Sequence, residues 1–235
     1  MKFIKALPTL CVLLLPCALR AESFEGKVSM KITSDSKDTP QSMDYLLKEG
    51  FVRMNIATER GAMGMILDLK NRQMIMLMPP QRMYMVRPFG DAANPAGGPA
   101  GDRAPANDSE IQVTSTKETI LGYECTKVVV TRGSETSEIW VTSELGTFMG
   151  MSPGGGGMGR RSQVPKGWEL ALKGKGWFPM RVVSLESGKE KFRLEVTAVQ
   201  KESEPDSQFA PPDGWTKFDL GSIMGGGGRM PFGNN

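Results

Sequence analysis

Methionine recurs at every second position through the middle of this chain. Residues two apart in an extended strand point to the same face of a sheet, so this spacing predicts that the thioethers share one face of neighbouring strands. The alternate positions are mostly apolar as well, at Ile66, Ile75, Leu77, Tyr84 and Val86. A sheet that is apolar on both faces needs two covers, and one of them is a candidate ligand. The methionines concerned are Met63, Met65, Met74, Met76, Met78, Met83 and Met85.

Short alternating segments separated by turn residues make up most of the remaining sequence. This pattern is typical of an all-β or β-rich α+β fold with few or no helices. One segment stays open between two structures, because Trp168 and Leu172 have helical spacing while Trp168, Leu170 and Leu172 also alternate. The segments with strand-like alternation, besides those of the methionines, are 24–32, 52–56, 110–117, 123–131, 138–142, 177–185 and 191–199.

The start of the chain has the form of a secretory signal. Lys2 and Lys5 precede an apolar stretch at 7–19, and Ala21 supplies a small residue for cleavage. That stretch is too short and too rich in proline for a membrane span. Cleavage of the signal peptide would remove Lys2, Lys5 and Arg20 and leave 26 basic residues against 26 acidic ones. The mature chain would then have no net charge, which gives no basis for nucleic-acid binding. We expect a periplasmic or secreted protein without a transmembrane segment in the mature chain.

Composition divides the chain into three parts. They are a signal peptide at 1–21, one β-rich domain at 22–220 and a glycine-rich tail at 221–235 that is predicted to be disordered. The domain carries two segments rich in glycine or proline, at about 88–108 and 146–165. Both are predicted to be flexible insertions.

Several kinds of catalytic and metal site are excluded by the composition. The chain contains no histidine, which removes Ser-His-Asp and Cys-His catalysis and zinc sites built from imidazole. Ser152, with Gly150 and Gly154 on either side, has the G-x-S-x-G spacing of a hydrolase nucleophile elbow. Such an elbow uses the backbone N–H of the residue after the serine for its oxyanion hole, and Pro153 has no N–H. Cys125 is the only cysteine after the signal, so it forms no internal disulfide; a buried thiol is favoured over a reactive one. We expect no enzyme, no catalytic residues, no cofactor and no metal site.

The methionines themselves allow three interpretations. They are core filler, because methionine fills irregular gaps well. Alternatively they form a soft apolar surface for a lipid, an acyl chain or a partner protein, since the unbranched thioether repacks around varied shapes. The third and least favoured interpretation is Cu(I) binding, for which thioethers are suitable soft ligands.

Seven short motifs occur in an order that resembles one known family. They are FEGKVSMKIT, FVRMNI, MILDLKNRQMIMLMPPQRMYMV, ILGYECTKVVV, EIWVT, LEVTAVQ and FAPPDGW, and they extend from about Phe24 to Trp215. In this order they are similar to an uncharacterised group of secreted bacterial proteins, the domain-of-unknown-function family 4412.

The resemblance implies a distant relationship to periplasmic lipoprotein carriers and outer-membrane lipoprotein-sorting proteins. Those proteins form a curved antiparallel half-barrel whose concave apolar face holds acyl chains or is plugged by helices. The family has no established catalytic residues to carry over. We therefore expect an exported, non-enzymatic protein that holds a lipid or a lipoprotein acyl chain on the methionine side of a curved sheet. The alternative is a structural or interaction protein of the cell envelope, in which the methionines fill the core.

Overall fold

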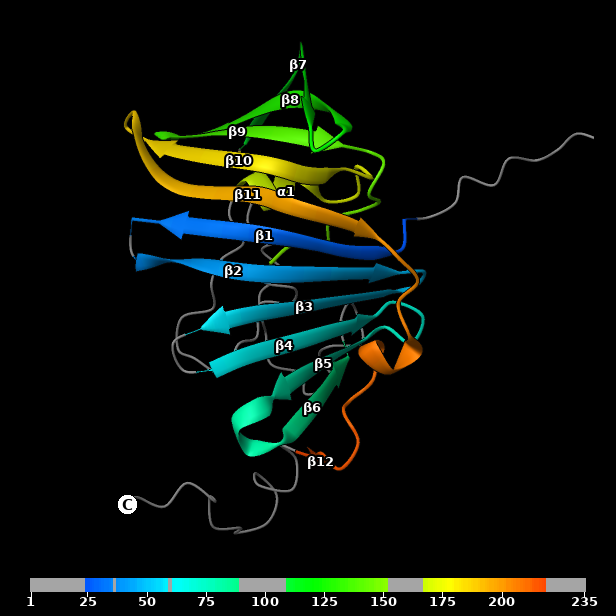
Figure 1. The fold of residues 1–235 in the computed structure, drawn as a ribbon. Coiled ribbons are helices and arrows are strands. Elements are labelled where there is room, and N and C mark those ends of the chain that lie inside the picture. Colours follow the sequence, from blue (N-terminus) through cyan, green and yellow to red (C-terminus); the bar gives the residue numbers. More distant parts are fainter. Residues whose placement is uncertain (1–23, 36, 59–60, 89–108, 152–166, 219–235) are drawn as a thin grey trace, which may run out of the picture.

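The computed structural model forms one open, curved sheet of twelve strands in its described residues (Figure 1). Its spatial order is β12-β6-β5-β4-β3-β2-β1-β11-β10-β9-β8-β7. Neighbouring strands are antiparallel, except that β12 runs parallel to β6. The predicted signal peptide and tail, and most of both predicted insertions, lie outside the described residues. The described ranges are 24–35, 37–58, 61–88, 109–151 and 167–218.

The strand and helix bounds agree closely with the alternation in the sequence. The three short helices among the described residues are η1 (Pro79–Gln81), α1 (Gly167–Leu172) and η3 (Asp206–Phe209). The strands are β1 (Gly26–Ser34), β2 (Lys37–Lys48), β3 (Phe51–Thr58), β4 (Gly61–Asp68), β5 (Gln73–Met78), β6 (Met83–Pro88), β7 (Glu110–Ile120), β8 (Tyr123–Arg132), β9 (Glu135–Thr142), β10 (Phe178–Glu186), β11 (Lys189–Lys201) and β12 (Thr216–Lys217).

Two meanders meet at the centre of the sheet. Strands β1 to β6 follow one another on one side, β7 to β11 follow one another on the other, and β11 pairs with β1 to join them. Tight turns link most neighbours. Between β7 and β8, for example, Leu121 and Gly122 both have positive φ, of 51° and 88°. Positive φ at both central residues is the conformation of a type I′ hairpin turn.

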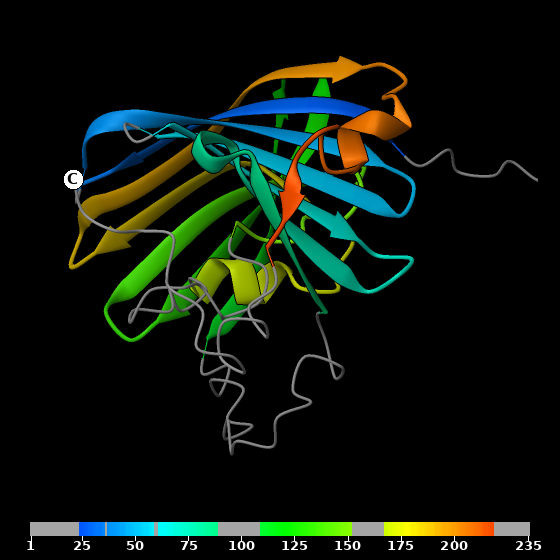
Figure 2. The same cartoon turned by 90° about the horizontal axis from the view of Figure 1, so that it is seen from below.

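The concave face of the sheet is filled by an apolar core beneath α1. Figure 2 shows the sheet curling around this helix. Side chains from both meanders contribute, since alternate residues of each strand point to the same face. Residues 143–151 supply a further part of the core, with Leu145 and Phe148 buried. The residues of this core that are fully buried are Val28, Tyr45, Cys125, Val128, Ile139, Trp168, Leu172, Phe178, Val182 and Leu194.

The convex face is covered over β3–β6 by the segment that follows β11, residues 202–218, which we call the C-terminal strap. Phe209 is buried against Leu46, Ile66, Ile75 and Leu77, and the partly buried Phe51, Tyr84, Val86 and Trp215 pack against this cluster. Polar contacts fix the path of the strap. Arg53 Nη1 donates to Gln208 O at 2.8 Å. Thr216 N donates to the carbonyl of Arg82, just before β6, at 3.0 Å, and Phe218 N donates to that of Tyr84 in β6 at 2.7 Å. The strap therefore supplies the second cover that a doubly apolar sheet requires.

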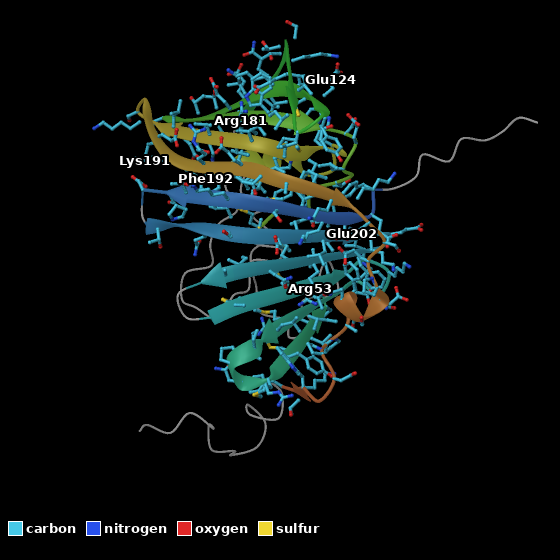
Figure 3. All side chains as sticks on the ribbon, viewed as in Figure 1. Arg53, Glu124, Arg181, Lys191, Phe192 and Glu202 are labelled. Carbon is cyan, nitrogen blue, oxygen red and sulfur yellow. The ribbon has the colours of Figure 1, made fainter. Side chains whose placement is uncertain are left out.

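Charged pairs occupy the other half of the convex face, where no strap lies. Arg181, labelled in Figure 3, donates two 3.0 Å hydrogen bonds to the Glu118 carboxylate. Lys127 Nζ lies 2.8 Å from Glu138 Oε2. The outer edge strand β7 has a bulge between Val113 and Lys117. Bulges and charged side chains at a sheet edge discourage the addition of another strand.

The predicted β-rich fold with a curved antiparallel sheet and few helices is confirmed. Two strands were missed, the two-residue β12 and the long β2. Strand β2 carries the alternation of Met43, Tyr45 and Leu47, but Leu46 between them is buried on the opposite face and blurs the pattern. The open segment around Trp168 is the helix α1, not a strand.

Candidate functional site

Strand register places all seven predicted methionines on one face of the sheet. Met65 in β4 pairs with Met76 in β5, which pairs with Met85 in β6. Directly opposed residues share a face, and so do residues two apart in one strand. The same face therefore carries the remaining four. We call the surface made by Met63, Met65, Met74, Met76, Met78, Met83 and Met85 the methionine face.

This face is the concave one. Met74 is buried in the same cluster as Trp168 and Leu172 of α1, and Met65 and Met76 pack against that cluster. The row formed by Met65, Met76 and Met85 continues through Met54 of β3 to Tyr45 of β2. The methionines thus continue the apolar core outward from the helix-covered centre toward β6.

Burial of the methionine face falls from one end of the strands to the other. Met74 and Met85 are buried, at 6% and 3% exposure, and serve as core. Met65, Met76, Met78 and Met83 are partly buried. Met63, near the turn between β3 and β4, is 56% exposed. Five of the seven thioether side chains therefore retain surface at which an apolar molecule can be held by dispersion and water exclusion.

A stack of aromatic rings lies beside the methionine row. Tyr45 stacks on Phe148 with ring centres 5.4 Å apart, Phe148 on Trp168 at 5.9 Å, and Trp168 on Phe192 at 6.0 Å. Phe178 meets the edges of Tyr45 and Phe148. The rings come from β2, β10, β11, α1 and residues 143–151, so the stack ties α1 to both meanders.

Two polar atoms lie within this aromatic stack. The Tyr45 hydroxyl accepts a hydrogen bond from Met149 N at 2.8 Å, and burial raises the pKa of Tyr45 well above its usual value, which keeps the hydroxyl protonated. Trp168 is fully buried, and its Nε1–H has no hydrogen-bond partner among the described residues. Neither residue was predicted from the sequence to belong to a functional site. The alternation around Tyr45 was a usable signal, whereas nothing in the sequence distinguishes the Trp168 indole.

The single thiol of the domain does not form a reactive site. Cys125 is fully buried, and its Sγ lies 3.4 Å from Tyr123 O. Burial raises its pKa, so the thiol is protonated at neutral pH. Within the described ranges, no group of three or more histidine, cysteine, aspartate or glutamate side chains is placed to hold a metal ion. Those ranges also contain no helix of the length and hydropathy needed to cross a membrane.

Three solved structures show weak similarity to this chain. PNGF-II, in the P21 space group, has 16% identity and a TM-score of 0.48 over 86% of this chain, which spans 32% of the PNGF-II chain. An uncharacterised conserved protein from Thermus thermophilus has 9% identity and a TM-score of 0.49, over 84% of this chain and 91% of its own. MucB in complex with MucA(peri) has 9% identity and a TM-score of 0.43, over 83% and 56%. At these values the likenesses establish neither a shared activity nor a shared ligand.

Comparison of the sequence with family models assigns the chain to a family. No curated protein matches it. The family model of the domain of unknown function DUF4412 matches residues 24–215. This range includes eleven of the twelve described strands, all but β12. This agrees with the motif order from Phe24 to Trp215 in the sequence. The chain belongs to the DUF4412 family.

Proposed function

We propose that this protein is an exported, non-enzymatic binding protein that holds the acyl part of a lipid or lipoprotein on the methionine face. The observation that carries the proposal is the unequal covering of the two sheet faces. The strap buries the convex patch around Phe209, whereas Met63, Met65 and Met76 on the concave side keep accessible surface. An apolar surface that the described residues leave partly uncovered is a candidate for a ligand.

The chemistry of the face suits a hydrocarbon chain. The partly exposed Met65 and Met76 pair with each other, and each also pairs with a buried thioether, Met54 or Met85. Thioethers adapt to chains of different shape without a fixed polar contact. About 12 buried methylenes would contribute about 10 kcal/mol at about 0.8 kcal/mol each. After an association cost of at least about 4 kcal/mol, this corresponds to a Kd on the order of 10–100 μM.

This estimate makes chain length a direct test. Each additional buried methylene should lower the Kd about fourfold until the chain is longer than the face. Saturated fatty acids of increasing length, competing with a fluorescent fatty acid, would give the series. An affinity that does not change with length would contradict apolar binding along the row.

Substitutions that change polarity at constant length locate the site. The triple variant Met63→Gln, Met65→Gln, Met76→Gln should lose binding of the fluorescent fatty acid at least tenfold, because glutamine keeps the side-chain length and adds a polar amide. The matched triple variant with leucine at the same positions should bind as the wild type does. Circular dichroism on both variants checks the fold. Equal binding by the glutamine and leucine variants would remove the methionine face from the proposal.

The competing function is that of an envelope interaction protein with a filled core. The burial of Met74 and Met85 favours it, since those two thioethers already pack as core. Native mass spectrometry of protein purified gently from a periplasm separates the two functions. Bound mass equal to a lipid supports the carrier, whereas bare protein mass favours the interaction protein.

Cu(I) is the remaining alternative, because the register sets Met65, Met76 and Met85 side by side. The same spectra would detect it as an added copper mass after Cu(I) is supplied. The lipid proposal predicts no such added mass.

A further inference from the structure

Methionine occupies only one of the two sheet faces in strands β3 to β6. The register and the side-chain period of two put every methionine of these strands on the concave face. The convex face of the same strands is apolar too, yet the cluster that the described residues form under the strap contains no thioether. A residue that served only to fill gaps would be equally useful there. The methionines therefore follow the face that keeps accessible surface.

Exposure divides these methionines into a reachable set and a protected set. Across the sheet the reachable side chains are direct neighbours, because Met65 pairs with Met76, and the two methionines that flank η1 pair with each other. The reachable set is Met63, which is 56% exposed, with the partly buried Met65, Met76, Met78 and Met83. The protected set is Met54, Met74 and Met85, which are 1%, 6% and 3% exposed.

Reactivity is what a thioether adds to such a surface. Leucine would hold a hydrocarbon by the same dispersion and water exclusion. A thioether, unlike leucine, is also oxidised by hydrogen peroxide to a polar sulfoxide. The sulfur lone pair attacks one peroxide oxygen, the S–O bond forms while the O–O bond breaks, and the second oxygen leaves as water. Sulfur loses two electrons, which the peroxide takes up. Because the peroxide must touch the sulfur, this reaction selects the reachable set.

We propose that the reachable methionines are a peroxide-modification site, and that their oxidation to sulfoxides switches off apolar binding on the methionine face. The switch rests on the proposed function and adds regulation to it. A sulfoxide oxygen accepts hydrogen bonds from water, and an acyl chain laid over it removes that water without supplying a donor. Oxidation of Met65 and Met76 puts two such oxygens on directly paired residues.

The order of oxidation tests the site without any ligand. Purified protein is treated with hydrogen peroxide for increasing times, and its tryptic peptides are sequenced by mass spectrometry. Two peptides contain an internal comparison, since each holds a protected methionine with a reachable one: Met74 with Met76, and Met85 with Met83. We expect Met63 to react first and the protected set to react about tenfold more slowly than the partly buried methionines. Circular dichroism at each time checks that the protein is still folded.

Binding of the fluorescent fatty acid tests the switch. In folded protein whose five reachable methionines are sulfoxides, affinity should fall at least about tenfold. Methionine sulfoxide reductases specific for the two sulfoxide epimers should restore it. The matched control carries leucine at the same five positions and keeps every other methionine, including the partly buried Met149 and Met151. This variant should bind as the wild type does and lose no affinity in peroxide.

The outcomes separate the site, the switch and the proposed function. If the protected methionines oxidise as fast as the reachable ones in folded protein, the site is wrong. If the fully modified protein binds as before, or the leucine variant also loses affinity in peroxide, the switch is wrong while the proposed function stands. If the untreated wild type binds no fatty acid, the proposed function and the switch are both wrong, and the order of oxidation alone decides the site.

Discussion

The hydrogen bond between Tyr45 and Met149 gives a prediction that can be worked out from the geometry. Tyr45→Phe keeps the ring that stacks on Phe148 and meets Phe178 edge-on, so it creates almost no cavity. It removes the hydroxyl that accepts from Met149 N at 2.8 Å, and Tyr45 is fully buried. An unsatisfied buried N–H costs about 1–3 kcal/mol. We therefore expect the free energy of unfolding to fall by about 1–2 kcal/mol.

Urea denaturation measures this change directly. The midpoint should fall while the slope with denaturant stays constant, because the surface exposed on unfolding is unaltered. The melting temperature should fall by about 2–8 °C for a domain of this size. Tyr84→Phe, on the half-buried ring of the convex face, is the control and should change stability by no more than about 0.5 kcal/mol. A Tyr45→Phe protein as stable as the wild type would refute the role of this bond.

The pH dependence of the free energy of unfolding supplies an independent check of the contribution of Tyr45. Burial raises the pKa of Tyr45 above its ordinary value of 10.0. In the unfolded chain the hydroxyl ionises near pH 10, whereas in the folded protein it does not. The unfolded state therefore binds fewer protons above that pH, and stability falls as pH rises. Tyr45→Phe lacks this contribution, so the difference in stability between the two proteins should narrow above about pH 10.

Two further predictions concern the convex face and a turn. Phe209→Ala should lower the free energy of unfolding by about 3–5 kcal/mol, because Phe209 is 5% exposed, yet fatty-acid affinity should persist in protein that calorimetry shows to be folded. Lost affinity in folded protein would mean that the two faces are coupled. At Asp68, burial alone would raise the pKa, but hydrogen bonds from Asn71, Gln73 and the backbone outweigh it and lower the pKa below 3.8. Asp68→Asn should therefore cost about 1–3 kcal/mol at neutral pH and progressively less as acid protonates Asp68, with unfolding at several pH values as the measurement.

Local periodicity in the sequence was enough to assign most strands and the shared face of the methionines. A strand has a side-chain period of two, so the spacing of Met74, Met76 and Met78 fixes their common face whatever they pack against. The same rule placed Ile66 and Ile75 on the opposite face, where the structure has them. The rule failed for β2, because Leu46 is buried under the strap while its neighbours point into the concave core.

Periodicity could not decide which methionines are accessible or what covers each face. Those properties depend on α1 and the strap, which lie about 100 residues or more from β4 in sequence. Trp168 showed this most clearly, since helix and strand spacing fitted its segment equally well.

The sequence by itself therefore determined the fold class, the sidedness of the methionine strands and the absence of histidine chemistry. The tertiary structure alone decided that the methionine face is concave, that five of its seven side chains keep accessible surface, and that Tyr45, Phe148, Trp168 and Phe192 form one stack. The physical reason is that side-chain direction follows from the local backbone, whereas burial and hydrogen-bond satisfaction depend on segments that are distant along the chain.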